Sequence, residues 1–173
     1  MLAKVEVLIA SVMATGLVAF IGFELSGLLL SGSQDAAQVE AIEVEAGEVV
    51  RVSDEFPPAY FGGFFPPEPN GVWLGVTQGL ARIRLVGADL GSAFRATFYA
   101  PEYPGAPSRT VAVNVNGNVA ETVVGAGSTG SIQIDLDLKR EFDIRFACDP
   151  AQTPPNGDVR KLCVMLLELV VVS

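Results

Sequence analysis

From residue 39 onward, apolar and polar side chains alternate one by one in short runs that are separated by turns rich in glycine and proline. The alternation is clearest over residues 39–45, 81–85 and 131–138. A period of two residues places apolar side chains on one face of a strand and polar ones on the other. Because no segment of this region shows a convincing helical period, residues 39–173 are predicted to form an all-β domain.

About eight strands are expected, and nine segments are candidates for them. The candidate segments are residues 39–45, 49–52, 81–85, 94–100, 110–114, 119–124, 131–138, 142–148 and 162–172. The Asn116-Gly117 pair predicts a two-residue hairpin, because a type I′ turn requires a positive φ at both central positions. The last segment is apolar on both faces except for Glu168, and it is therefore expected to be a covered, central strand. These features favour an antiparallel β-sandwich of the jelly-roll kind.

An apolar segment precedes the β domain. Residues 7–23 contain no charged side chain, and apolar residues continue after Glu24. A helix needs about 20 apolar residues to cross a bilayer, so residues 7–30 are predicted to be a transmembrane helix, joined to the domain by a polar linker at 31–38. The alternative is a cleaved signal peptide that ends at the small residues 31–33, but the apolar segment is longer than the roughly 7 to 15 residues usual there.

The charges that flank this segment predict its orientation. Lys4 is the only basic residue before Arg51, whereas several acidic residues follow the span. Since cytoplasmic flanks carry an excess of lysine and arginine, residues 1–6 are predicted to lie in the cytoplasm and residues 39–173 outside it. The expectation is a single-pass protein of the bacterial inner (cytoplasmic) membrane, with the bulk of its chain periplasmic or extracellular.

One face of the predicted helix carries small side chains. At about 100° per residue, one sector contains Ser11, Thr15, Ala19, Gly22 and Ser26. Small residues on one face let helices approach closely in lipid, so other integral membrane subunits are the expected partners. Glu24 lies on nearly the opposite side, and it either reaches the outer interface or pairs with a further subunit.

The composition excludes several classes of function. The chain has 20 acidic and 11 basic residues, a formal charge of −9 and no histidine. Negative charge repels phosphate backbones, which argues against nucleic acid as a partner. Without histidine, the Ser-His-Asp and Cys-His arrangements and the usual imidazole zinc sites are excluded. No catalytic residue, cofactor or metal is predicted, and the protein is expected not to be an enzyme.

An acidic group lies near the end of the seventh predicted strand. Four carboxylates and three basic side chains interleave there: Asp135, Asp137, Glu141 and Asp143 with Lys139, Arg140 and Arg145. Carboxylates of this kind can bind calcium. The basic neighbours favour a solvated strand face instead.

The chain has two cysteines, Cys148 and Cys163, on either side of a proline-rich loop. If the domain lies outside the cytoplasm, a disulfide between them is the simplest interpretation. Metal binding is the weaker alternative, because two thiolates make only half of a zinc site.

Three short motifs carry a resemblance to a known family. Residues 63–73 fit the pattern G-F/W-x-x-x-E-x-x-G-x-W, residues 158–164 are similar to a D-x-R-x-L-G-hydrophobic signature, and residues 111–117 fit V-x-V-x-V-N-G. Over roughly residues 58–172 the chain resembles the β-sandwich modules, similar to carbohydrate-binding modules, that are appended to bacterial membrane glycosyltransferases and other envelope polysaccharide proteins. Cys163 stands where that family usually has glycine. No glycosyltransferase domain accompanies the module, so the family's catalytic activity is not implied.

The resemblance implies a sandwich that contacts a glycan through aromatic side chains, since sugars stack on aromatic faces. The candidate contacts to a glycan or a partner are Tyr60, Phe61, Phe64, Phe65 and Trp73, with Phe56 nearby. The alternative is that these rings belong to the core or pack under the proline-rich loop.

Two functions are compatible with these features. The first is a non-enzymatic accessory or scaffold subunit that packs its helix in a larger photosynthetic, respiratory or polysaccharide-synthesis complex and braces it with the sandwich. The alternative is a membrane-tethered glycan-binding module of envelope polysaccharide metabolism. The expected partners are accordingly integral membrane subunits and a glycan or lipid.

Overall fold

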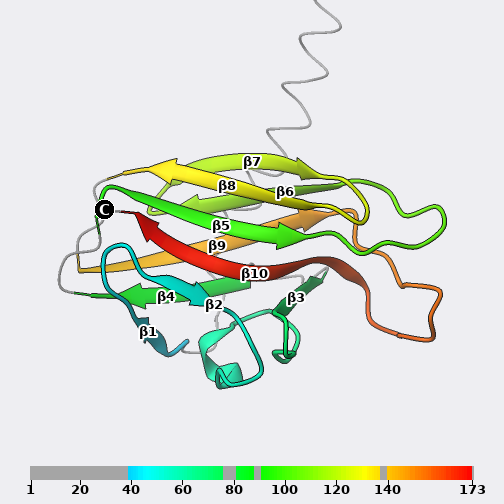
Figure 1. Cartoon of the computed structure of the whole chain (residues 1–173), viewed down its shortest axis with the longest axis horizontal. Helices are drawn as coiled ribbons and strands as arrows, with labels where there is room; N and C mark the ends of the chain where they lie inside the picture. Colours follow the sequence, from blue (N-terminus) through cyan, green and yellow to red (C-terminus); the bar gives the residue numbers. More distant parts are fainter. Residues whose placement is uncertain (1–38, 76–80, 88–90, 137–139, 173) are drawn as a thin grey trace, which may run out of the picture.

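A computed structural model of the chain describes residues 39–75, 81–87, 91–136 and 140–172. These residues contain ten strands and one short 3₁₀ helix, and Figure 1 shows the longer strands running along the length of the domain. The strands are β1 (Ala41–Glu43), β2 (Val49–Arg51), β3 (Val72–Gly75), β4 (Ala81–Val86), β5 (Ala93–Tyr99), β6 (Arg109–Val115), β7 (Asn118–Val124), β8 (Thr129–Asp135), β9 (Glu141–Asp149) and β10 (Leu162–Val172), and the 3₁₀ helix is η1 (Pro58–Tyr60).

The strands form two sheets that pack face to face. One sheet has the order β1-β4-β9-β6-β7, and the other has the order β2-β10-β5-β8, with β3 also paired to β10. The main core cluster draws buried side chains from both sheets. The predicted β-sandwich is therefore confirmed.

One pairing differs from the predicted antiparallel arrangement. β1 runs parallel to β4, with Ala41 opposite Arg84 and Glu43 opposite Val86. Between these two strands the chain crosses to the other sheet, where it forms β2 and β3, and then returns. A long crossover of this kind is what parallel neighbours require. Alternation in the sequence reports which face is buried, but it does not report strand direction.

β3 is the strand that the sequence pattern does not predict. It has only four residues, all of them buried, so apolar and polar positions do not alternate. It also follows a segment rich in proline and glycine, which is typical of a loop. The other nine strands coincide with the nine predicted segments, and their ends differ from the predicted ones by at most three residues.

Two finer predictions are confirmed. Asn116 (φ 51°) and Gly117 (φ 90°) form the two-residue turn between β6 and β7. β10 is central, because it pairs with β5 along one side and with both β2 and β3 along the other. Glu168, its one charged residue, accepts a hydrogen bond from the Thr97 hydroxyl at 3.1 Å.

The core lies between the two sheets, and four of its buried phenylalanine rings form pairs across them. Phe94 packs edge-to-face on Phe142 with centroids 5.9 Å apart, and Phe98 packs in the same way on Phe146 at 6.1 Å. Each pair joins β5 of one sheet to β9 of the other. Such pairs contribute about 1 kcal/mol beyond the burial of their area. They fix how the sheets sit on each other, and so they position the loops at the ends of β5 and β9.

The predicted transmembrane helix at 7–30 lies outside the described residues, as do residues 1–6 and the linker at 31–38. The same is true of the predicted helix-packing residues Ser11, Thr15, Ala19, Gly22, Ser26 and Glu24. Within the described ranges, no helix has the length and apolar character needed to span a bilayer. The membrane anchor and its orientation therefore stay predictions from the sequence.

Candidate functional site

Three loops meet at one end of the sandwich and enclose a cleft of about 240 Å³. They are the turn before β3, the β5–β6 loop and the β9–β10 loop, and Figure 1 shows the last two projecting from the same end of the domain. The polar and aromatic residues that line the cleft are Glu68, Trp73, Glu102, Tyr103, Asn156, Asp158 and Arg160. Apolar wall is added by Pro101, Pro154, Pro155 and Leu162.

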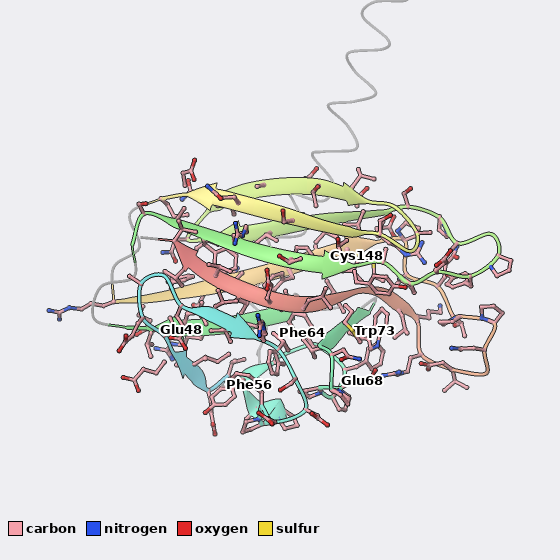
Figure 2. All side chains as sticks on the ribbon, in the orientation of Figure 1. Glu48, Phe56, Phe64, Glu68, Trp73 and Cys148 are labelled. Carbon is pink, nitrogen blue, oxygen red and sulfur yellow. A yellow bond between two sulfur atoms is a disulfide. The ribbon has the colours of Figure 1, made fainter. Side chains whose placement is uncertain are left out.

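A tight turn from Glu68 to Gly71 places the tryptophan of the cleft. The two residues exchange backbone hydrogen bonds of 2.8 and 3.1 Å. Gly71 has a φ of 151°, and a Cβ at this position would lie 2.4 Å from the carbonyl oxygen of Leu166. The turn therefore packs directly on the backbone of β10, which only a residue without a side chain permits. Trp73 then donates a hydrogen bond from Nε1 to Glu68 Oε2 at 3.1 Å, and Figure 2 shows these two side chains close together.

A single guanidinium joins the two carboxylates on this side of the cleft. Arg160 donates from Nε to both oxygens of Asp158 at 3.0 Å and from Nη2 to Oδ2 at 2.7 Å. Its Nη1 donates to Glu68 Oε1 at 2.8 Å. The guanidinium also lies over the ring of Phe65, 5.3 Å from the centroid. All three charged groups are thus held in place by several contacts.

The protonation of this network is fixed by the same contacts. The side-chain hydrogen bond from Arg160 holds the pKa of Asp158 below its ordinary value of 3.8. The bond to Asp158 in turn raises the pKa of Arg160 above the usual range of arginine. Both groups therefore stay charged at neutral pH, and the ion pair persists down to mildly acidic pH.

The network brings together two motifs that are far apart in the sequence. Glu68 and Arg160 are separated by 92 positions, yet their side chains are in direct contact. Gly71 and Trp73 complete the first motif, and Asp158 completes the second. Residues of two of the three motifs that carried the family resemblance therefore meet at the cleft.

Tyr103, which lines the cleft from the β5–β6 loop, is held in place by a buried arginine. Arg109 has no solvent exposure, and its Nη2 donates to the Tyr103 hydroxyl at 2.9 Å. Nε and Nη1 of Arg109 donate to the carbonyl oxygens of Cys163 and Pro107 at 3.3 and 2.6 Å. The Tyr103 hydroxyl donates in turn to Gln152 Oε1 at 3.0 Å. These bonds tie the β5–β6 loop to both β10 and the β9–β10 loop.

The sequence patterns do not single out Tyr103 or Arg109. A charged residue at the edge of a predicted strand is typical of an exposed position. The burial of Arg109 can nevertheless be read from the alternation of the strand. Arg109 lies two residues before Val111 and four before Val113, and both valines are fully buried. Extending the two-residue period by one step places the arginine on the inner face.

The predicted disulfide between Cys148 and Cys163 is confirmed. Cys148 lies on β9 and Cys163 on β10, so the bridge links the two sheets, with 6.1 Å between the Cα atoms. Cys163 is fully buried, and its neighbour Leu162 lines the cleft. The bridge therefore anchors both ends of the loop that forms one wall of the cleft.

The six aromatic residues singled out from the sequence lie in different surroundings. Of these, Trp73 lines the cleft, although only 9% of it is exposed. Phe65 lies under Arg160 beside the cleft. Phe61 is 4% exposed and belongs to the core, and the half-buried Phe56, Tyr60 and Phe64 pack against it. Phe64 pairs with Leu74, the residue after Trp73, but its ring packs on Phe61 and Phe146 (Figure 2).

Two carboxylates of the acidic group at 135–143 form ion pairs with arginines of β4. Asp143 pairs with Arg82 at 2.6 Å, and Glu141 pairs with Arg84. Asp137 and Lys139 lie outside the described residues. Within the described part of the chain, no three acidic or thiol side chains are grouped so as to hold a metal ion. The pairing of carboxylates with arginines fits the solvated strand face that the sequence favours.

No family model matches the chain, and no curated protein matches it. Among solved structures, it is similar to a family 35 carbohydrate binding module from Clostridium thermocellum, at 14% identity and a TM-score of 0.45, over 73% of this chain and 98% of that chain. It is also similar to CBM35 from Cellvibrio japonicus Abf62, at 12% identity and a TM-score of 0.40, over 73% of this chain and 95% of that one. The chain resembles carbohydrate-binding modules.

A further similar structure is an acetyl xylan esterase from Butyrivibrio proteoclasticus, at 11% identity and a TM-score of 0.47 over 72% of this chain. The chain spans 32% of the length of that esterase. These three solved structures all have TM-scores below 0.5. They assign no binding residue to this chain, so the chemistry of the cleft has to follow from its own side chains.

Proposed function

We propose that the sandwich is a glycan-binding module and that the cleft between the three loops holds a sugar. The observation that carries this proposal is the composition of the cleft wall. Two aromatic rings and several prolines provide apolar surface, and rigidly held carboxylate, amide and guanidinium groups provide hydrogen bonds. A sugar ring has apolar C–H faces and a rim of hydroxyl groups, and this wall offers a complement to both.

The size of the cleft fits a small ligand. Its volume of about 240 Å³ is below the range of roughly 300 to 1,000 Å³ that is usual for drug-sized molecules. A single sugar ring is therefore the expected occupant. Because Arg109 fixes Tyr103 and the turn at Gly71 fixes Trp73, the wall is organised before a ligand binds, which limits the entropy lost on binding.

We propose binding without catalysis. Glycoside hydrolysis uses a pair of carboxyl groups, one of which must be protonated to act as an acid. In the cleft, both oxygens of Glu68 accept hydrogen bonds, and Asp158 is held in its charged form by Arg160. Glu102 is then the remaining carboxylate among those that line the cleft. One free carboxylate does not make a catalytic pair.

The location of the module is also a proposal. The disulfide supports a compartment outside the cytoplasm, since such bonds persist in oxidising surroundings. The apolar segment 7–30 supports a tether in the cytoplasmic membrane. We therefore propose a glycan-binding domain displayed on the periplasmic side of the bacterial inner membrane.

Binding to a glycan array tests the proposed function. The full chain, purified in mild detergent, is expected to bind at least one class of envelope or cell-wall glycan. Tyr103→Ala is expected to weaken that binding about tenfold, because the loss of one aromatic wall costs roughly 1.5 kcal/mol. Tyr60→Ala is the matched control, since Tyr60 is a half-buried tyrosine that does not line the cleft. Equal weakening by both variants would contradict the assignment of the site.

A second candidate function is the accessory subunit of a membrane complex. The small-residue sector from Ser11 to Ser26 favours it, because such a face allows close helix packing in lipid. Gly22→Leu is expected to release the chain from partners that co-purify with it in mild detergent, as measured by mass spectrometry, whereas Leu17→Ile is expected to retain them. A chain that always elutes alone would speak against this function.

A further inference from the structure

We infer that the cleft selects uncharged glycans over acidic ones. This inference rests on the proposed glycan-binding function and names the class of sugar that the site takes. It follows from the arrangement of charges around the cleft. The cation that could receive an acidic sugar is already occupied, and a carboxylate that would repel such a sugar is not neutralised.

The occupied cation is Arg160. A guanidinium recognises a carboxylate by presenting two parallel N–H groups to its two oxygens. In Arg160 the edge formed by Nε and Nη2 is directed at Asp158, at distances of 2.7 to 3.0 Å. The remaining nitrogen, Nη1, is bonded to Glu68 at 2.8 Å. A sugar carboxylate that approached the remaining N–H groups of Arg160 would lie next to both of these carboxylates.

The carboxylate that is not neutralised is Glu102. It lines the cleft, and none of the ion pairs found among the described residues involves it. Its carboxyl group lies over Gly127, where a Cβ would be 2.9 Å from the Glu102 Cδ. The absence of a side chain at Gly127 thus leaves room for this carboxyl group at the rim. Three carboxylates and one guanidinium give the described lining a formal charge of −2.

Arg160 is the only cation among the described residues that line the cleft. Arg109 is fully buried, and its bonds go to two carbonyl oxygens and the Tyr103 hydroxyl rather than into the cleft. Lys161 follows Arg160 in the chain, but it does not line the cleft. The formal charge of the whole chain, −9, adds long-range repulsion of the same sign.

The same groups suit the hydroxyls of a neutral sugar. Glu102 can accept hydrogen bonds from hydroxyl groups. Asn156 accepts the backbone N–H of Asp158 through Oδ1 at 3.1 Å, which orients the amide and leaves its NH₂ group to donate. The cleft thus presents both a donor and an acceptor next to the apolar rings.

Matched pairs of oligosaccharides test the inference. Trp73 is the only tryptophan of the chain and lines the cleft, so its fluorescence reports binding to the full-length protein. The probes are tetrasaccharides of glucose, galactose and mannose, each compared with the tetrasaccharide of the corresponding uronic acid. At least one neutral probe is expected to bind about tenfold more tightly than its acidic counterpart at low ionic strength. The difference in affinity between the neutral and the acidic probe is expected to become smaller at high salt, because salt screens the charges.

Two variants assign the effect to the cleft. Glu102→Gln is expected to raise the affinity for the acidic probe severalfold. The affinity for the neutral probe is expected to change much less. Glu121→Gln changes the net charge by the same amount at an exposed position of β7, outside the cleft. It is expected to leave the ratio of the neutral-probe affinity to the acidic-probe affinity unchanged. Acidic probes that bind as tightly as neutral ones would overturn the inference while glycan binding stands. Binding of none of the six probes would count against the proposed function itself.

Discussion

Replacement of Gly71 by alanine is expected to destabilise the sandwich by about 4 kcal/mol. The φ of 151° at this position is in a region that residues with a side chain rarely adopt, at a cost of about 1–3 kcal/mol. The new Cβ would also lie 2.4 Å from the Leu166 carbonyl oxygen, and relief of such overpacking costs about a further 1–3 kcal/mol. Because the contact is with backbone of the central strand β10, a change of side-chain rotamer cannot relieve it.

Thermal unfolding of the full chain measures this effect. A loss of 4 kcal/mol is expected to lower the melting temperature by more than about 10 °C. Gly105→Ala is the matched control, since Gly105 also has a positive φ, +80°, but a Cβ added there would have no atom within 4 Å. That variant is expected to lose about 1 kcal/mol, from backbone strain alone. If the two variants melt at the same temperature, the close approach of the Glu68–Gly71 turn to β10 is wrong.

The strands and the site differ in how far the sequence predicts them. Alternation, the apolar last segment and the glycine- and proline-rich turns between segments together predict nine of the ten strands. The sequence pattern does not predict β3, because all four of its residues are buried. The sequence pattern does not predict the parallel pairing of β1 with β4 either, since the period of the side chains carries no information on strand direction.

The cleft depends on contacts between residues that are far apart in the chain. The sequence marks Glu68 and Arg160 only through separate motifs, and nothing local indicates that their side chains meet. Of the predicted aromatic contacts, Trp73 lines the cleft while Phe61 belongs to the core, because the segment around Phe61 folds back onto the sandwich. Tyr103 lies in a loop without pattern, and its role emerges only from the buried Arg109.

Cys163 links the disulfide to the wall of the cleft. It is a fully buried half-cystine whose partner, Cys148, is on the facing sheet. The carbonyl of Cys163 accepts the Nε hydrogen bond of Arg109, which in turn holds Tyr103. The bridge is therefore connected to the cleft wall through two successive hydrogen bonds.

Reduction of this disulfide is expected to destabilise the sandwich by about 3 kcal/mol. The bridge closes a loop with a sequence separation of 15, and a cross-link of this length restricts the unfolded chain by about that amount. The melting temperature of the full chain is expected to fall by on the order of 10 °C in a reducing buffer. The fold should survive, because the phenylalanine pairs and the aliphatic core between the sheets do not depend on the bridge.

A Cys148→Ala/Cys163→Ala double variant separates the bridge from other effects of the reductant. Its melting temperature is expected to be low already and to be the same with and without reductant, because it has no disulfide to lose. Alkylation of the unfolded wild-type chain without reductant, followed by intact-mass measurement, counts free thiols directly, and none are expected. Two alkylated cysteines in protein taken from its native cells would contradict the disulfide. They would also remove the main structural support for an oxidising compartment, since a chain kept in a reducing cytoplasm holds its thiols free.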